Sequence, residues 1–98
     1  MNRLSSFFKK NLLEGKTALI TYLICGDPDI RTTQKIMNTM VDSGVDAIEL
    51  GIPFTDPIAD GPIIQRGVER ALKKNISLSN VFSLVKEFRK TNIFTPIV

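Results

Sequence analysis

The stretch TALITYLICGDPD, Thr17 to Asp29, decides the fold class of this chain. Its first part, Thr17 to Cys25, is an almost unbroken apolar run rich in residues that favour strands. A strand covered on both faces has this pattern, and such strands are typically parallel. Gly26, Asp27 and Pro28 then supply a tight turn, a possible helix cap and a residue suited to the first helical position. The stretch therefore predicts a buried strand that leads into a helix.

The segments on either side of this stretch alternate between helix and strand patterns. Apolar residues recur at helical spacing in four segments: residues 4–12, 30–41, 62–72 and 78–88. Two more apolar runs have the pattern of strands: residues 46–54 and 93–98. We therefore expect an α/β protein with parallel strands near residues 17–24, 46–51 and 95–98.

Two of the predicted helices present an apolar face that we expect to pack on the rest of the fold. In the first helix this face consists of Leu4, Phe7, Phe8 and Leu12. The polar face is only mildly basic, which favours docking within the protein over membrane binding. The last helix, capped by Ser77, carries Leu78, Val81, Phe82, Val85 and Phe88.

Composition excludes several classes of function. The chain has 98 residues, 43% of them hydrophobic, and a net charge of +3 from dispersed basic residues, which argues against a nucleic-acid partner. The lone Cys25 allows no internal disulfide and no zinc knuckle, and the absence of histidine leaves acid–base chemistry to carboxylates, Tyr22, Cys25 or lysines. With no long apolar run and no secretory signal, we expect a cytoplasmic protein without a membrane segment.

The predicted sheet is small for a complete domain. A parallel sheet of three strands leaves apolar faces and strand edges uncovered. We therefore expect residues 1–98 to be the N-terminal part of a single larger domain, truncated at or in the third strand.

Two acidic residues flank the connection after the second predicted strand. Glu49 lies within an apolar run and shares one strand face with Ala47 and Gly51, which leave room beside it. Asp60 closes a connection that contains three prolines, and a stiff loop can present a side chain at a fixed place. Because α/β folds place their sites at the carboxyl ends of strands, both acids are candidate site residues. Each also has a structural alternative: Glu49 as an ion-pair partner, and Asp60 as a turn or cap residue.

The motif that joins these acids resembles a known family. ELGIPFTDPIADGPIIQ, residues 49–65, together with CGDPD, residues 25–29, is similar to the signature of the tryptophan synthase α chain. The resemblance extends over essentially all 98 residues. It implies the N-terminal portion of a (β/α)₈ TIM barrel, about the first third of a barrel of ~250 residues.

This resemblance also implies an activity and roles for five residues. The family is a lyase of L-tryptophan biosynthesis that cleaves indole-3-glycerol phosphate to indole and glyceraldehyde 3-phosphate. Glu49 is implied as the main acid–base residue, Asp60 as the acceptor of the indole N–H, and Tyr22 as the aromatic residue against the indole. Pro53 and Asp56 are implied to face a partner, the pyridoxal-phosphate β chain of an α2β2 complex. No metal or organic cofactor is implied for this chain itself.

The sequence also departs from the family pattern and leaves two other functions open. Thr21 and Ile24 replace the usual Pro and Thr near the end of the first strand, which changes the polarity of the loop. The phosphate-binding loops of the family are expected beyond Val98, so the 98-residue piece alone is expected to be inactive. One alternative is another phosphosugar-processing TIM-barrel enzyme, and the other is a non-catalytic fragment that binds a partner chain.

Overall fold

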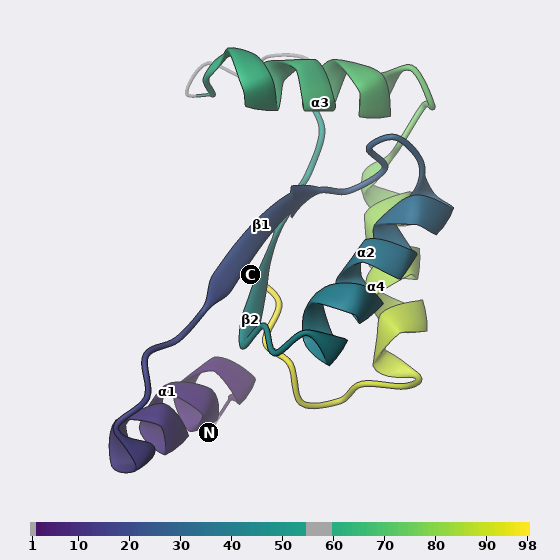
Figure 1. Cartoon of the computed structure of the whole chain (residues 1–98). Coiled ribbons are helices and arrows are strands. Elements are labelled where there is room, and N and C mark those ends of the chain that lie inside the picture. The colour runs from purple at the N-terminus through teal and green to yellow at the C-terminus, as the bar shows by residue number, and fades with distance from the viewer. Residues whose placement is uncertain (1, 55–59) are drawn as a thin grey trace.

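The computed structural model describes residues 2–54 and 60–98, and its elements follow the predicted α/β order (Figure 1). The elements are α1 (Arg3–Glu14), β1 (Ile20–Ile24), α2 (Ile30–Asp42), β2 (Ala47–Gly51), α3 (Pro62–Leu72) and α4 (Leu78–Arg89). The predicted cap of the last helix is confirmed, because the Ser77 side chain accepts from the backbone N–H of Asn80 and Asn80 reciprocates. None of the helices in the described part of the chain is long and apolar enough to cross a membrane.

The two strands are parallel, as predicted. Ile20 lies opposite Ala47 and Tyr22 opposite Glu49, so their side chains alternate in step. β1 is shorter than expected, since pairing begins at Ile20 rather than near residue 17. The C-terminal segment adds a parallel bridge between Ile97 and Ile48 on the other edge of β2. Residues 95–98 therefore pair in the predicted direction, through one bridge rather than a full strand.

The core lies between the strands and two helices that cover one face of them. α2 and α4 lie side by side on this face (Figure 1). The buried cluster consists of Cys25, Met37, Ile48, Leu50, Val81, Leu84 and Phe88. Burying a large apolar side chain contributes about 1.5–3 kcal/mol, so this cluster is the main source of stability for the layer. The predicted α4 face is partly wrong, because Leu78 and Phe82 are 51% and 64% exposed.

The opposite face of the strands is open. Ile20 and Tyr22 are 46% and 41% exposed, and Glu49 is exposed between two buried neighbours. The expectation that β1 is covered on both faces is therefore wrong for the described residues. The physical reason is that these side chains point away from α2 and α4, which supply a layer on one side only.

Helix α1 packs through only part of the predicted face. Leu4 and Phe7 are half-buried and Asn11 is buried, whereas Phe8 and Leu12 are 45% and 82% exposed. Two adjacent stripes of the helix are apolar enough to dock, and periodicity alone does not choose between them.

The turn after β1 is arranged differently from the expectation. Asp29, rather than Asp27, caps α2 by accepting a hydrogen bond from the backbone N–H of Thr32 at 2.7 Å, and the helix begins at Ile30 rather than Pro28. Asp27 instead accepts two hydrogen bonds from Arg70 of α3, at 2.7 Å from Nε and 3.0 Å from Nη2. A bidentate arginine–carboxylate pair is geometrically specific, so it ties the turn to α3.

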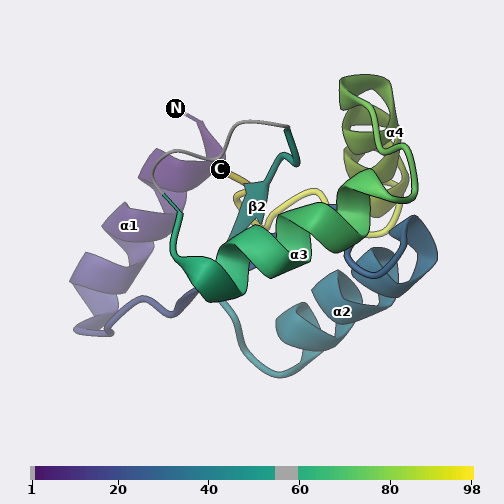
Figure 2. The ribbon, with the colours of Figure 1, turned by 90° about the horizontal axis from the view of Figure 1, so that it is seen from above.

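Helix α3 lies across the carboxyl ends of the strands (Figures 1 and 2). Its buried side chains Val68 and Ala71 form a second small cluster with Ile24 of β1. Gly67 lies so close to β1 that an added Cβ would be 2.6 Å from Ile24 Cδ1 and 2.9 Å from Asp27 Oδ2. Glycine here allows the approach of α3 that the ion pair then secures.

Candidate active site

The centre of the site is a pair of side chains on adjacent strands. Tyr22 of β1 and Glu49 of β2 are register partners, so both point to the open face of the strands. Neighbouring strands are about 4.8 Å apart, so the two residues start from adjacent positions on that face. Glu49 is held there because Ile48 and Leu50 on either side of it are buried against the helices.

The Tyr22 ring leans over Gly51, two residues after Glu49 on the same strand face. The three atoms nearest to a Cβ built at Gly51 all belong to Tyr22, and a Cβ would meet its hydroxyl oxygen and lie 2.8 Å from its Cζ. The space beside Gly51 is therefore filled by the phenol. This orientation carries the hydroxyl toward the carboxyl end of β2.

Asp60 lies immediately before α3 and is half-buried. The N-cap of that helix is Gly61, and no side-chain cap hydrogen bond is made there. Asp60 is therefore not the helix cap that its place before Gly61 and Pro62 suggests, and its side chain is left for another interaction.

The pKa of the Tyr22 phenol is influenced by both carboxylates. Burial raises this pKa above its ordinary value of 10.0, and the negative charges of Asp60 and then Glu49 raise it further. An anionic phenolate beside two carboxylates is disfavoured by like-charge repulsion. Tyr22 and Glu49 thus share the open face of β1 and β2, and Asp60, on the segment that enters α3, is near enough for its charge to influence the phenol.

We expect this arrangement to be measurable by titration of Tyr22. The ultraviolet absorbance of tyrosinate, taken as a difference against a Tyr22→Phe variant, should show a midpoint above 10.0 in the folded protein. Asp60→Asn should lower the midpoint more than Glu49→Gln, because the charge of Asp60 makes the larger contribution. The pKa of Tyr22 is higher in the folded protein than in the unfolded chain. The contribution of Tyr22 to the free energy of unfolding is therefore fully present below the unfolded-state pKa and is lost as the pH rises through the folded-state pKa. Equal Tyr22 midpoints in the wild type, Asp60→Asn and Glu49→Gln would contradict an influence of the two carboxylates on the phenol.

The predicted partner-facing segment is only partly described. Pro53 is buried, and Phe54 beside it is 58% exposed. Asp56 lies outside the described residues. The partner roles of Pro53 and Asp56 therefore remain predictions.

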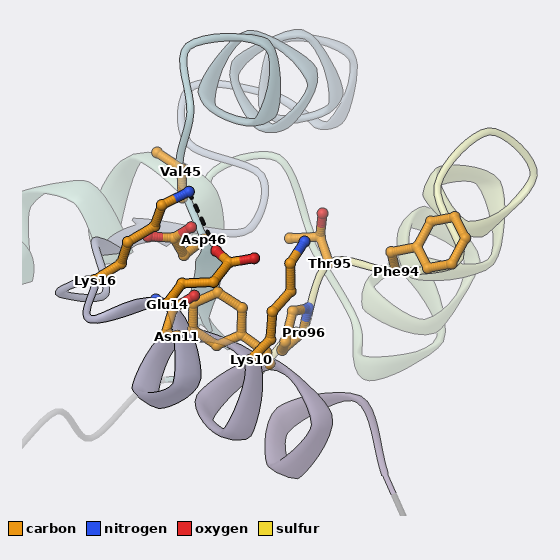
Figure 3. Close-up of a pocket in the computed structure, with 10 residues that line it drawn as sticks. Lys10, Asn11, Glu14, Lys16, Val45, Asp46, Phe94, Thr95 and Pro96 are labelled. Carbon is orange, nitrogen blue, oxygen red and sulfur yellow. Dashed lines mark ion pairs between the residues drawn. The ribbon is translucent and has the colours of Figure 1, made fainter.

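The hollow drawn in Figure 3 lies at the other end of the strands. It measures about 300 Å³ and is bounded by α1 and by the residues that lead into β2 and the C-terminal segment, among them Asp46 and Pro96. Lys16 and Glu14 form an ion pair of 3.2 Å at its edge. In barrels of parallel strands the amino-terminal end serves stability, so this hollow is separate from the candidate site. Residues 2–54 and 60–98 contain no group of three or more acidic, Cys or His side chains that could hold a metal ion.

Sequence reasoning did not find three contributors to this region. The Asp27–Arg70 pair joins residues far apart in the chain, and the contact of Tyr22 with Gly51 crosses two strands. Gln65 donates from Nε2 to the backbone carbonyl of Asp60 at 2.7 Å. The only sequence signal for a role of Gln65 is its position at the end of the motif of residues 49–65.

The parallel strands, the helices on one face and the polar groups at the carboxyl ends define the N-terminal portion of a TIM barrel. The family model described as tryptophan synthase alpha chain matches residues 8–98. The chain belongs to this family.

Individual relatives agree with the family match. The tryptophan synthase alpha chain of Nitrosomonas europaea is 55% identical over all 98 residues, which are 36% of that protein. The Neisseria gonorrhoeae protein of the same name is 57% identical over 86 residues, covering 88% of this chain and 33% of its own. The crystal structure of tryptophan synthase subunit alpha from Legionella pneumophila superposes on 99% of this chain with a TM-score of 0.97 and 44% identity, and the match covers 37% of that structure. This chain thus spans about a third of the length of its relatives.

Proposed function

We propose that these residues form the first part of a tryptophan synthase α chain, a lyase that cleaves indole-3-glycerol phosphate to indole and glyceraldehyde 3-phosphate in the biosynthesis of L-tryptophan. The observation that carries this proposal is the pairing of Glu49 with Tyr22 on the open face of the strands, with Asp60 on the segment that enters α3, in a chain of this family. The reaction needs a proton-transfer group at indole C3 and a hydrogen-bond acceptor at the ring nitrogen, and these two acids come from different segments.

The chemistry accounts for both acids. The bond between indole C3 and the glycerol chain breaks in a retro-aldol step, and neutral indole is a poor carbon leaving group. Adding a proton to C3 makes the ring electron-poor, so that the electrons of the breaking bond return to it as indole departs. The hydroxyl of the adjacent glycerol carbon loses its proton and becomes the aldehyde. Atoms balance without water, and no step in this scheme needs a metal or an organic cofactor.

Each site residue has a defined task in this scheme. Glu49 donates the proton to C3 and takes the proton from the glycerol hydroxyl, since a positioned carboxyl group can serve as acid and then base. Asp60 accepts a hydrogen bond from the indole N–H and stabilises the positive charge that develops on the ring. Tyr22 packs its ring against the indole. The phenol adds a hydrogen-bond donor and no competing charge, since its ordinary pKa of 10.0 already leaves it neutral near pH 7 and the shift is upward.

The test is an assay of the complete barrel, by which we mean residues 1–98 followed by the later strands and helices, supplied where needed by the Nitrosomonas europaea relative. We expect it to release indole from indole-3-glycerol phosphate. A barrel that processes a different phosphosugar and leaves this substrate intact would refute the proposal in favour of the alternative enzyme class. Residues 1–98 alone should be inactive, because a substrate phosphate needs donors that a third of the barrel does not supply.

We further propose that the complete protein acts in the cytoplasm with a pyridoxal-phosphate β chain in an α2β2 complex. A solved relative from Pyrococcus furiosus is described as a tryptophan synthase α2β2 complex with mutual activation, and it supports this assembly. In our proposal the segment that includes Pro53 and Asp56 faces the β chain, and Asp56 meets a basic group there. Asp60 lies four residues further along the same segment, so partner binding and catalysis are coupled through a short piece of chain.

This coupling predicts that Asp56→Ala weakens activation of the complete barrel by the β chain. Indole release should rise less on addition of the β chain than it does for the wild type, while the free energy of unfolding of the isolated barrel stays nearly the same. Asp42→Ala, on an exposed position of α2, is the matched control and should be activated normally. Normal activation of the Asp56 variant at the same β-chain concentration would contradict the coupling.

A further inference from the structure

The start of helix α3 lacks the usual side-chain cap. Its N-cap Gly61 makes no side-chain cap hydrogen bond, and Pro62 at the first turn has no backbone N–H. A helix start is commonly secured by a Ser, Thr, Asp or Asn side chain at the N-cap, and here none is present. The peptide between Asp60 and Gly61 must therefore be held in another way.

Gln65 supplies this support from within the helix. Its side-chain Nε2 donates to the Asp60 carbonyl oxygen at 2.7 Å, while its backbone N–H donates to the Gly61 carbonyl at 3.0 Å. One residue thus holds two successive carbonyl groups. The Asp60 carbonyl precedes the N-cap and so lies outside the helical hydrogen-bond series, which makes the side-chain amide its specific partner.

Holding this carbonyl restricts the backbone from which the Asp60 side chain extends. The orientation of the peptide between Asp60 and Gly61 is set by the ψ angle of Asp60, so the hydrogen bond limits rotation of the backbone that carries the carboxylate. A misplacement of about 1 Å at a reacting group can cost on the order of a hundredfold in rate. A supporting hydrogen bond to the backbone of the residue that carries the carboxylate is therefore of consequence for turnover.

We propose that Gln65 is a positioning residue for Asp60, holding the Asp60 carbonyl through its side-chain amide so that the carboxylate stays directed at the substrate ring. The proposal rests on the function proposed above. It requires a side chain with a donor at the end of three carbons. An ionised glutamate has the same length but only acceptors, so it repels the carbonyl.

Two substitutions separate the donor from the shape of the side chain. Gln65→Met keeps length and helix propensity and removes the donor, so we expect a roughly three- to tenfold lower kcat in the complete barrel, with a smaller change in KM. Gln65→Glu should be more damaging at neutral pH. Its kcat relative to the wild type should recover as the pH falls toward about 5, because a protonated carboxyl group can again donate to the carbonyl.

Gln34→Glu, at a half-buried position of α2, is the matched control and should show no such pH-dependent recovery. A second measurement needs no activity at all: in Gln65→Met the titration midpoint of Tyr22 should move toward that of Asp60→Asn, because the carboxylate leaves its place beside the phenol. Wild-type kcat and pH dependence in both Gln65 variants, or an unchanged Tyr22 midpoint, would overturn the proposal. Failure of the wild-type barrel to release indole would instead count against the proposed function, and the Tyr22 measurement would still decide the role of Gln65.

Discussion

Replacing Glu49 by glutamine is expected to lower the rate of indole release from indole-3-glycerol phosphate by a factor of about 10²–10⁴, the usual contribution of a positioned acid–base group. The amide has nearly the same size and stays beside Tyr22 on the open face of the strands, so the fold should be retained. It cannot exchange a proton with C3 or with the glycerol hydroxyl. The measurement is the steady-state rate of indole formation by the complete barrel across a range of pH.

Glu69→Gln, on an exposed position of α3, makes the same chemical change away from the open face and should leave the rate unchanged. If Glu49→Gln stays within a few-fold of the wild type, the catalytic role of Glu49 is wrong. If it loses activity but keeps its affinity for the β chain, the alternative of a fragment that only binds a partner is excluded.

Asp60→Asn is expected to have the second-largest effect, on the order of a hundredfold, comparable to the loss of one preorganised electrostatic contact. The amide oxygen can still accept from the indole N–H. It carries no charge, so it does not stabilise the positive ring that forms when C3 is protonated. The effect should appear in kcat more than in KM, because the charge develops only along the reaction.

Asp42→Asn on the exposed side of α2 is the control for this change and should be neutral. Unchanged turnover in Asp60→Asn would return Asp60 to its alternative role as a turn residue. A slower turnover that is fully explained by a smaller fraction of folded protein would also assign Asp60 to the turn and not to the reaction.

The elements that sequence could predict are those whose signals are local. The apolar spacing of α2 is confirmed by the burial of Thr33 and Met37, and the Ser77 cap by its hydrogen bonds. The parallel direction of the strands follows from the helix that must connect them. The stiff connection and the resemblance predict that Glu49 and Asp60 act at one site, and this joint role remains a prediction.

What sequence could not predict depends on partners distant in the chain. The exposure of Leu12 and Phe82 reflects which of two apolar stripes meets a neighbour, and that choice is made by tertiary packing. Asp27 has a strong local preference for a cap, yet it pairs with Arg70, 43 residues away. Ion pairs between residues far apart in the chain can override local propensity, and no periodic pattern in the sequence indicates them.

The contact between Tyr22 and Gly51 also bears on how this site can change during evolution. The atoms nearest to a Cβ at position 51 all come from the one phenol, so a larger residue at 51 must displace the Tyr22 ring and finds room once that ring has been reduced. The two substitutions are therefore strongly epistatic, and their order matters. A lineage can acquire both substitutions if residue 22 becomes smaller first. In the opposite order, the intermediate carries a larger residue at 51 together with the full Tyr22 ring. Deep mutational scanning of both positions together would reveal this one-way path, which scans of single positions do not register.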